Sequence, residues 1–435
     1  MKIKFAHISD VHLGAWRNER INELGYQAFE EVVNSIIEEN VDFVILSGDL
    51  YDVTNPKVEV IDLATRLLKR LKDLEIPLYG IMGSHDFSPS NKSMIRPLIT
   101  AGLFIDAWLP ELTDDNKIKL NFILDPKTHI KIAGLRARKR SLEIEEYQEL
   151  DRESLEVEKG PKIFILHTMV SELKPKEFKE MESAPKSLLP QNFDYYAGGH
   201  LHKLVPDKLR VDGVVLQVND KNSVIYPGFV FPTDFRELEK IKYGGFCLVS
   251  GDIVGDKLDL NVKFKPIKIV DIENIIIDCT NNTVSEVLNT LKHELSNRDV
   301  KDKIVTIRLY GVLTSGKTYD IKNHEIIQNF RAKGAYEVLI NKHALTTMEY
   351  QAISVSTGKS NEEIESTIIK EHANNVKIKK FTPNELEKKI HQLLTTLGEE
   401  RQVGSKVMNY NESFKQSFLR IFEIQKIKAS EESEI

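Results

Sequence analysis

Five short turns that carry aspartate and histidine constrain this chain more than any other feature of its sequence. Each turn directly follows a short apolar run rich in Val, Ile, Phe or Tyr, and such runs between helical patterns predict buried strands of a βαβ sheet. The runs are Ile3–Ser9, Phe43–Ser47, Pro77–Met82, Lys162–Leu166 and Tyr195–Ala197. The turns are Asp10-Val11-His12, Gly48-Asp49, Gly83-Ser84-His85-Asp86, His167 and Gly199-His200-Leu201-His202. Because ligands bind beyond the carboxyl ends of such strands, we expect the five turns to lie together.

These turns offer carboxylates and imidazoles but no thiol, a donor set that suits borderline divalent ions such as Mn²⁺, Fe²⁺ or Zn²⁺. The candidate ligands exceed what one ion needs and would hold two ions about 3.5–4 Å apart, bridged by one carboxylate. They are Asp10, His12, Asp49, His167, His200 and His202. Taken singly, each is more often a structural residue, but five such turns in order favour a shared site. Paired cations clamp a phosphate and supply a nucleophile near neutral pH, so the pattern predicts phosphoester hydrolysis.

The motifs D-x-H, GD, GSHD, H and G-H-x-H, in this order, resemble those of the calcineurin-like metallophosphoesterases. Within that superfamily, HISDVHLG, GDLYD, GSHD and GGHLHK resemble the Mre-eleven/SbcD family of DNA double-strand-break repair nucleases, most closely its archaeal members. The motifs cover residues 5–202, with weaker similarity at Ile304–Leu309 and Gly334–Lys342. The resemblance implies an α/β fold with a two-layered β-sandwich metallophosphoesterase core flanked by helices. It also implies a smaller α+β cap domain and a helical C-terminal tail, and we expect the three parts at residues 1–265, 266–345 and 346–435.

The resemblance also assigns roles to single residues. It implies that Asp10, His12, Asp49 and His202 hold one Mn²⁺ ion, and that Asp49, His167 and His200 hold a second, with Fe²⁺ or Zn²⁺ as possible substitutes. His85 is implied to contact the scissile phosphate or protonate the leaving oxygen, with Asp86 orienting it. The family usually has Asn where this chain has Ser84. We therefore expect Ser84 to hold the second ion more weakly, or through water.

The implied activity is that of a Mn²⁺-dependent deoxyribonuclease, with 3′-to-5′ exonuclease and single-strand endonuclease action on DNA ends and single strands. The implied partners are DNA, a second copy of the chain in a homodimer, and an ABC ATPase of the Rad-fifty/SbcC kind. Two alternatives remain open at this point. One is a metallophosphatase or phosphodiesterase for substrates other than DNA, and the other is a DNA-tethering scaffold in which Ser84 has weakened catalysis.

A basic run follows the predicted strand His129–Leu135. It contains Arg136, Arg138, Lys139 and Arg140. Such a run is either a solvated loop or a contact with DNA phosphates, which position a duplex without reading its sequence. The next segment, Leu142–Val157, predicts one acidic helix that faces outward.

Three helical patterns lie between the first motifs. Residues 20–38 predict a crossover helix, Val58–Leu74 predicts a second helix whose N-cap is Asn55, before Pro56, and residues 91–101 predict a third. The apolar stripe of the second helix is broader than one sheet contact requires. Either the second and third helices pack on the sheet, or they also form the dimer interface that the resemblance implies.

Two amphipathic helices are predicted near the end of the chain. The first follows the capping box Thr382-Pro383-x-Glu385 and carries an apolar stripe, and the second carries a mainly aromatic one. The stripe residues are Leu386, Ile390 and Leu393, then Phe414, Phe418, Ile421 and Phe422. A short helix of this kind cannot bury its stripe alone. It either folds back on the cap or docks in a partner's groove, and the resemblance implies the ATPase as that partner.

Composition sets broader limits. The net charge of −6 excludes a uniformly basic nucleic-acid-binding surface, so any phosphate-binding surface must be a local patch. Cys247 and Cys279 lie in strand-like contexts and predict core thiols in a reducing compartment. No apolar run approaches the roughly 20 residues that span a bilayer. We therefore expect a cytoplasmic, nucleoid-associated protein with no membrane contact.

Overall fold

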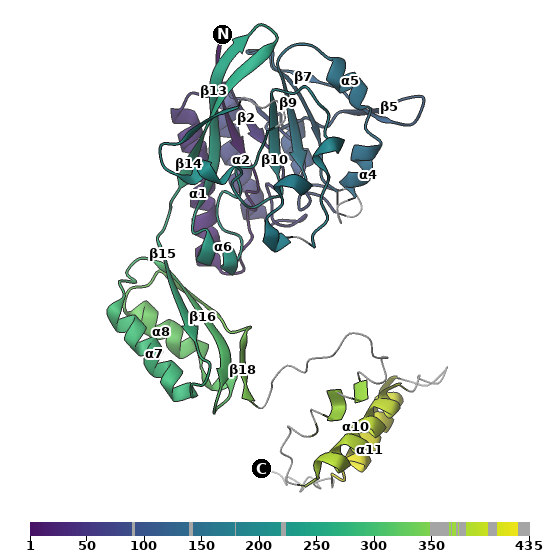
Figure 1. Cartoon of the computed structure of the whole chain (residues 1–435), viewed down its shortest axis with the longest axis vertical. Helices are drawn as coiled ribbons and strands as arrows, with labels where there is room; N and C mark the ends of the chain where they lie inside the picture. Colours follow the sequence, from purple (N-terminus) through teal and green to yellow (C-terminus); the bar gives the residue numbers. More distant parts are fainter. Residues whose placement is uncertain are drawn as a thin grey trace, which may run out of the picture. The chain divides into compact units, whose positions relative to one another are not determined.

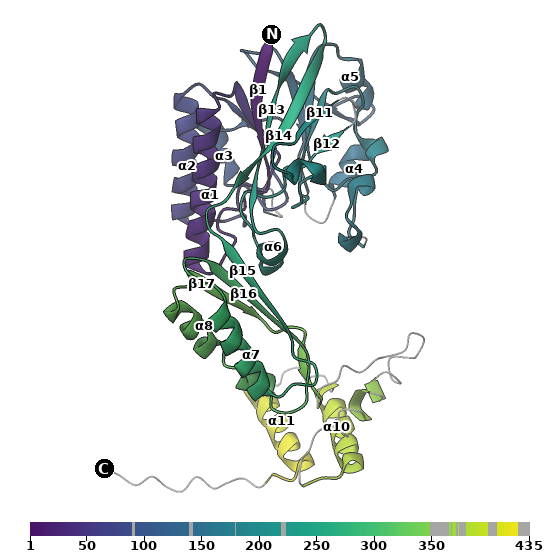
Figure 2. The same cartoon turned by 60° about the vertical axis from the view of Figure 1, so that its left-hand side comes forward.

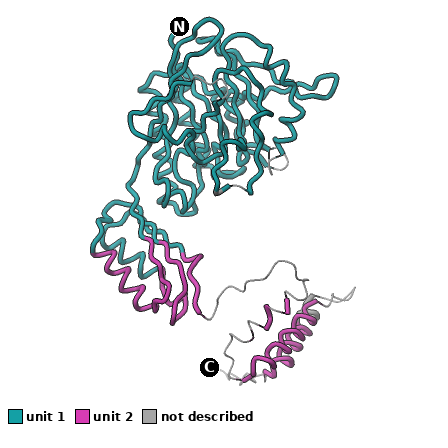
Figure 3. Tube along the Cα trace, viewed as in Figure 1, with its two compact units in different colours: residues 1–275, 297–307, 324–341 teal, residues 276–296, 308–323, 342–435 magenta. Residues whose placement is uncertain are grey.

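The computed structural model describes most of the chain. The described residues are 1–88, 92–138, 142–178, 180–218, 223–348, 365–366, 368–370, 373, 380–398 and 407–424. Contacts divide the chain into two compact units (Figure 3). Unit 1 comprises residues 1–275, 297–307 and 324–341, and unit 2 comprises residues 276–296, 308–323 and 342–435. The expected domain limits at residues 265 and 345 stay a prediction.

The larger sheet of unit 1 is built around β1 (Lys2–Ile8), as Figures 1 and 2 show. β1 pairs in parallel with β2 (Phe43–Leu46) and antiparallel with β13 (Gly244–Val254). The strand order is β11-β14-β13-β1-β2-β3-β4. The remaining strands are β3 (Leu78–Gly80), β4 (Ile105–Asp106), β11 (Val215–Val218) and β14 (Lys257–Ile267).

The second sheet has the order β12-β10-β9-β8-β7, with only β7 antiparallel to its neighbour. Its strands are β7 (Ile123–Leu124), β8 (Lys131–Leu135), β9 (Lys162–His167), β10 (Tyr195–Gly199) and β12 (Val224–Ile225). One buried cluster joins the inner faces of both sheets. Within it the Phe5 ring stacks on Phe43 with centroids 4.9 Å apart and meets Tyr195 edge-on at 5.3 Å. The predicted two-layered β-sandwich is confirmed.

Helices cover the outer face of each sheet. α1 (Glu19–Glu38) and α2 (Val58–Asp73) pack on the larger sheet through a second buried cluster, with α3 (Ile95–Thr100) beside them (Figure 2). The side chain of Asn18 caps α1 by accepting from the backbone N–H of Arg20 and Ile21. α2 instead follows Lys57, whose side chain makes no capping bond. The predicted cap at Asn55 was wrong by two residues.

Two short helices cover the second sheet, where one outward-facing helix was predicted. α4 (Glu143–Gln148) and α5 (Arg152–Val157) are separate, and the Asp151 side chain caps the second. Tyr147, Leu150 and Leu155 are buried against the sheet. The prediction of one exposed acidic helix was therefore wrong, because these apolar side chains hold the segment down.

The remaining elements are short or lie late in the chain. Unit 1 also contains α6 (Phe235–Lys240), the hairpin β5 (Pro110–Leu112) with β6 (Ile118–Leu120), and 3₁₀ turns at Ser171–Leu173, Lys176–Phe178, Lys186–Leu188 and Asp207–Arg210. A further sheet has the order β15-β16-β17, with β18 pairing with β16. Its parts are β15 (Ile272–Asp278), β16 (Ile304–Leu313), β17 (Glu337–Asn341), β18 (Leu345–Thr347), α7 (Val284–Asn297), α8 (Asn323–Ala332) and the 3₁₀ turn Thr318–Asp320.

The two predicted C-terminal helices form and contact each other. α10 (Pro383–Gly398) begins at the predicted capping box, in which Thr382 N–H donates to Glu385 over 2.8 Å. α11 (Val407–Ile421) ends where Lys389 of α10 donates to the Ile421 carbonyl over 2.6 Å. Leu386 is buried, whereas Phe418 remains 38% exposed. Phe422 of the aromatic stripe meets Phe381 edge-on, with ring centroids 6.4 Å apart. Part of the stripe therefore packs within the tail itself, which is neither of the two predicted arrangements. Among the residues described, none of the helices could cross a membrane.

Candidate metal centre

Four of the predicted metal ligands have backbone torsions that side chains usually avoid. Asp10, His12, Asp49 and His200 have φ values of 50°, 47°, 55° and 84°. Such left-handed conformations cost on the order of 1–3 kcal/mol each and persist only where the surroundings impose them. Here the turns bind one another, since Asp10 N–H donates to the Gly48 carbonyl and His12 N–H donates to the Asp49 carbonyl, both over 3.1 Å. Because four strained residues lie at one edge of the sheets, this edge is a candidate functional site.

Two glycines allow the turns to approach closely. Gly48 has a φ of 92°, and a Cβ there would overlap the His167 ring. A Cβ on Gly199 would overlap the Ser47 carbonyl oxygen. Larger residues at either position would therefore push the strand ends apart.

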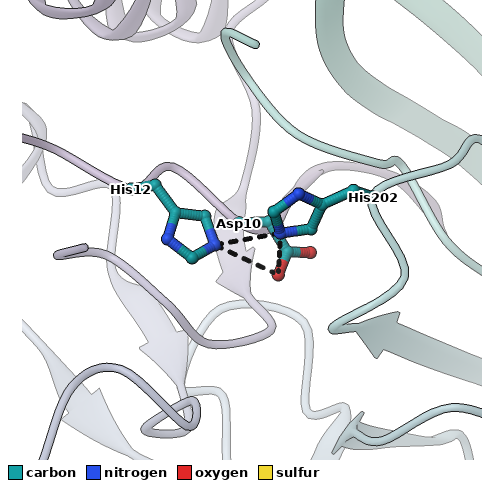
Figure 4. Close-up of side chains that lie close together, drawn as sticks. All are labelled: Asp10, His12 and His202. Atoms are coloured by element: carbon teal, nitrogen blue, oxygen red, sulfur yellow. Dashed lines mark hydrogen bonds and ion pairs between the residues drawn. The ribbon is translucent and has the colours of Figure 1, made fainter. Parts of the chain in front are cut away.

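The first group of candidate ligands comprises Asp10, His12 and His202 (Figure 4). The Nε2 atoms of the two imidazoles lie 3.0 Å apart. Asp10 Oδ1 lies 3.9 Å from His12 Nε2 and 3.6 Å from His202 Nε2. Three donor atoms from turns almost two hundred residues apart in the sequence thus face one point.

The second group comprises Asp10, Asp49 and His167. Asp49 Oδ2 lies 3.2 Å from His167 Nε2 and 3.6 Å from His12 Nε2, so this carboxylate faces both groups. A carboxylate in that position is the geometry that a bridging ligand requires. His200 adjoins this group, with its ring centroid 5.2 Å from that of His167. Its backbone N–H donates to both Asp10 carboxylate oxygens over 3.1 Å.

Three imidazoles are held in a fixed orientation by acceptors behind them. Nδ1 of His167 donates to the Ser47 carbonyl over 2.6 Å, and Nδ1 of His202 donates to Glu237 over 2.7 Å. Nδ1 of His12 donates to Asp52 over 3.2 Å. In the neutral imidazole, each bond leaves Nε2 as the nitrogen with a free lone pair, which is the tautomer that binds a metal.

Glu237 and Asp52 were not predicted as site residues. Asp52 lies three residues after Asp49 within the GDLYD motif, so the sequence did contain a signal for it. Glu237 lies on α6, 35 residues after His202, where no motif marks it. Its second carboxylate oxygen accepts from the Thr233 N–H over 2.7 Å and from the Thr233 hydroxyl over 2.9 Å.

The residues present fit a divalent cation. His167 Nε2 is buried and makes no hydrogen bond of good geometry, and its near neighbour is Asp49 Oδ2 at 3.2 Å; a buried polar atom of this kind requires an explanation. Burial and the neighbouring His167 lower the pKa of His200 to about 4, which keeps that imidazole neutral and able to bind a metal. Burial alone would raise the pKa of Asp49, but the positive charge of a protonated His167, 3.2 Å away, outweighs burial and holds that pKa well below its usual value. Against the opposing effect of burial, the neighbouring carboxylates raise the pKa of His167 to about 10 and that of His202 to about 9. A divalent cation would displace those protons and bind the same imidazoles beside the ionised carboxylate of Asp49.

His85 stands at the edge of the centre. Its ring lies edge-on to His12, with centroids 4.8 Å apart, and Nδ1 donates to the Asp52 carbonyl over 2.5 Å. The side chain is 47% exposed, so Nε2 remains able to exchange a proton. The His85 backbone N–H donates to Asp49 over 2.8 Å.

Asp86 acts on the backbone rather than on the His85 ring. Its carboxylate accepts from the N–H groups of Asp49, Gly83 and Tyr51 over 2.9, 2.9 and 3.1 Å. Asp86 thus fixes the two turns that carry His85 and Asp49, and the expectation that it orients His85 stays a prediction. Ser84 lies half-buried on the same turn.

The structure does not support the predicted DNA contacts after β8. Arg136 is only 5% exposed, and its guanidinium lies 3.5 Å from the centroid of the Trp108 ring. Arg138 pairs with Glu146 over 2.8 Å. Arg136 therefore cannot reach a DNA phosphate, and Arg138 already has an acidic partner. Lys139 and Arg140 lie outside the described residues.

Comparisons with known proteins agree with this geometry. The calcineurin-like phosphoesterase family matches residues 3–204. The DNA double-strand break repair protein Mre11 of Methanococcus maripaludis is 30% identical over 283 residues, which cover 63% of this chain and 69% of that protein. Mre11 of Saccharolobus solfataricus is 28% identical, and the match covers 62% of this chain and 66% of that protein. Mre11 of Sulfolobus acidocaldarius is also 28% identical, and the match covers 72% of this chain and 76% of that protein.

The matched residues contain all five metal-site turns, and the protein is a hydrolase that uses divalent metal. The sequence resemblance to the archaeal repair family is confirmed. This chain belongs to the Mre11 family of DNA double-strand break repair proteins.

Proposed function

We propose that this protein is a nuclease that cleaves phosphodiester bonds of DNA during double-strand-break repair, and that it does so with two divalent cations. The observation that carries the proposal is the convergence of five predicted ligands from four turns on one centre, with the sixth, His200, beside His167. The relatives, which are DNA double-strand break repair proteins, support DNA as the substrate.

The two groups of ligands suggest how the cations are shared. Asp10, His12, Asp49 and His202 would hold one ion, and Asp49, His167 and His200 would hold the other. We propose Mn²⁺ for both, because mixed carboxylate and imidazole donors suit a borderline ion. When bound, such a pair neutralises charge on the phosphate and activates water for in-line attack.

The protein's own groups would then complete the reaction. The proposed role of His85 is to contact the scissile phosphate and donate a proton to the leaving oxygen through Nε2, while Nδ1 stays bound to the Asp52 carbonyl. Asp86 keeps the His85 turn at its distance from Asp49. Ser84 would complete the second ion's shell less tightly than the Asn usual in the family.

The wider role follows from the family. We propose 3′-to-5′ exonuclease and single-strand endonuclease action, in a nucleoid-associated complex with a Rad-fifty/SbcC-like ATPase. The half-exposed stripe of the α10 and α11 pair is the proposed docking face, through Leu393, Phe414 and Phe418 in particular. We also propose a homodimer through α2 and α3, where Val58 is 76% exposed.

The test is Mn²⁺-dependent cleavage of single-stranded DNA by wild type and by His85→Ala. General acid catalysis contributes roughly 10²–10⁴-fold, so cleavage should fall by that factor. Mn²⁺ affinity should persist, because Asp49 binds the backbone of residue 85 and not its side chain. His324→Ala, which removes an exposed imidazole from α8, is the matched control and should cleave normally.

Equal activity in His85→Ala would remove His85 from the mechanism. A wild type that binds one Mn²⁺ per chain and cleaves nothing at saturating metal would favour the DNA-tethering scaffold instead.

A further inference from the structure

A pocket of about 670 Å³ adjoins the candidate metal centre. Asp49, His85, His200 and His202 line it on the metal side. One face of α6 lines it as well, through Arg236, Glu237 and Lys240. A substrate larger than the group bound at the metal centre would therefore extend along α6.

Two of the four basic residues that line the pocket already have partners. Lys203 pairs with Asp207 over 3.3 Å. Arg210 donates to the Tyr243 carbonyl over 3.3 Å and lies over the Tyr243 ring. Neither residue is free to give its full charge to a ligand.

Arg236 and Lys240 are different. They lie four residues apart on α6, so both point from the same side of the helix, and both are exposed. Within the part of the chain that the structure describes, no ion pair is recorded for either. The nearby acidic groups are used elsewhere, since Asp234 accepts from the Glu237 N–H over 2.8 Å and Glu237 accepts from His202.

α6 is held rigidly beside the metal centre. Glu237 joins it to His202, and the Thr233 N–H and hydroxyl fix the other oxygen of Glu237. Arg236 and Lys240 therefore lie on a short helix whose position is fixed by its bond to His202, a candidate metal ligand. Because the two basic side chains keep a fixed position relative to the metal centre, they are suited to bind the same substrate.

Several other residues that line the pocket are apolar. They include Met169 and Leu201, which are buried, and Phe178 and Met181. A phosphate gains nothing from such a surface, because desolvating its charge there is unfavourable. A polyanionic chain that crosses the pocket is therefore directed along α6.

We propose that Arg236 and Lys240 bind the backbone phosphates of the DNA strand next to the phosphate at the metal centre. This inference rests on the proposed function and adds the surface that grips the strand. The contacts hold phosphates and not base edges, so they add affinity without sequence preference. They take the place of the basic run after β8 as the proposed phosphate contact.

The test compares wild type with the double variant Arg236→Ala/Lys240→Ala on two phosphodiesters. One substrate is a single-stranded oligonucleotide, and the other is bis(p-nitrophenyl) phosphate, which has no adjoining phosphates. Losing two phosphate contacts should raise the KM for the oligonucleotide on the order of tenfold relative to the KM for the small diester. The slope of log affinity against log salt should become shallower by about 1.4, at roughly 0.7 per contact with a single strand.

Two further variants keep the result interpretable. Lys2→Ala/Lys257→Ala removes the same charge from exposed strand positions outside the pocket, and its salt slope should match wild type. Arg236→Glu/Lys240→Glu should raise the oligonucleotide KM further than the alanine variant does, because it repels the strand. Thermal unfolding shows whether each variant is folded.

Two outcomes would overturn the inference. An oligonucleotide KM and salt slope equal to wild type in the alanine variant, with DNA cleavage intact, would remove α6 from substrate binding while the proposed function stands. A wild type that hydrolyses the small diester but neither binds nor cleaves the oligonucleotide would reject the proposed function and the inference together.

Discussion

The imidazoles of the candidate metal centre owe their geometry to bonds on the side away from the metal. His202 illustrates this best, because Glu237 accepts from Nδ1 over 2.7 Å and is itself fixed by two bonds from Thr233. A carboxylate behind a histidine ligand fixes the tautomer and makes the other nitrogen a stronger donor.

Replacing Glu237 should therefore weaken metal binding without unfolding the protein. We expect Glu237→Gln to reduce Mn²⁺ affinity by roughly 10–100-fold, measured by isothermal titration calorimetry. Asp234→Ala is the control, since it removes the α6 cap at about 1 kcal/mol of stability but leaves the Glu237–His202 bond in place. Unchanged Mn²⁺ affinity in Glu237→Gln would show that the bond has no part in metal binding.

Ser84 allows a test in the opposite direction. An amide oxygen reaches a cation more easily than a short hydroxyl, so Ser84→Asn should tighten the weaker of two Mn²⁺ binding events. Competition titration with a fluorescent chelator would resolve the two events. Ser88→Asn, a few residues further along the same segment, is the matched control. Identical binding curves for Ser84→Asn and wild type would exclude position 84 from the metal centre.

At the scale of elements, the closest backbone approach in the metal centre is between Gly199 at the end of β10 and Ser47 just after β2. Gly199→Ala would set a Cβ against the Ser47 carbonyl oxygen, and such overpacking costs roughly 1–3 kcal/mol or more. Because His200 follows directly, Mn²⁺ affinity should fall as well. Urea unfolding and Mn²⁺ titration measure the two effects.

Gly213→Ala provides the comparison, because a Cβ there meets nothing within 4 Å. It bears only the cost of a left-handed backbone at φ +77°, about 1–2 kcal/mol, and should leave metal binding unchanged. Equal metal affinities in Gly199→Ala and wild type would mean that the strand ends tolerate separation.

Local patterns predicted the elements that a single stretch of sequence determines. Periodicity predicted α1 to within a residue, and the five strand-and-turn units appear where expected. It did not predict the break between α4 and α5, because the burial of Tyr147 and Leu155 depends on a sheet formed by distant residues. The burial of Arg136 depends on Trp108 in the same way.

The candidate ligands were predictable because each lies in a short motif. Glu237 was not, because only folding brings residue 237 to residue 202. The same limit applies to Arg236 and Lys240, whose charge matters through a pocket that no local pattern describes.

At the scale of the whole molecule, two sheets packed face to face bring together turns spread from Asp10 to His202. The larger sheet supplies the turns with Asp10, Asp49 and His85, and the second supplies those with His167 and His200. Neither sheet alone contains both groups of ligands. The metal centre therefore takes ligands from both sheets. Metal binding should stabilise the packing of the two sheets against each other.

Metal removal tests this dependence. Binding to the folded state alone stabilises a protein by about 2.7 kcal/mol at a hundredfold excess over Kd. We expect Mn²⁺ to raise the unfolding temperature of wild type in differential scanning calorimetry, and EDTA to reverse the rise. His167→Ala should show little response to Mn²⁺. A response as large as that of wild type would place the metal elsewhere.

The most direct measurement is anomalous diffraction from a crystal soaked in Mn²⁺, recorded near the manganese edge. We predict two peaks about 3.5–4 Å apart, with Asp49 between them, His12 and His202 on one, and His167 and His200 on the other. A single peak, or imidazoles of His200 and His202 turned away from Asp10 and Asp49, would contradict the two-cation centre on which the proposed nuclease depends.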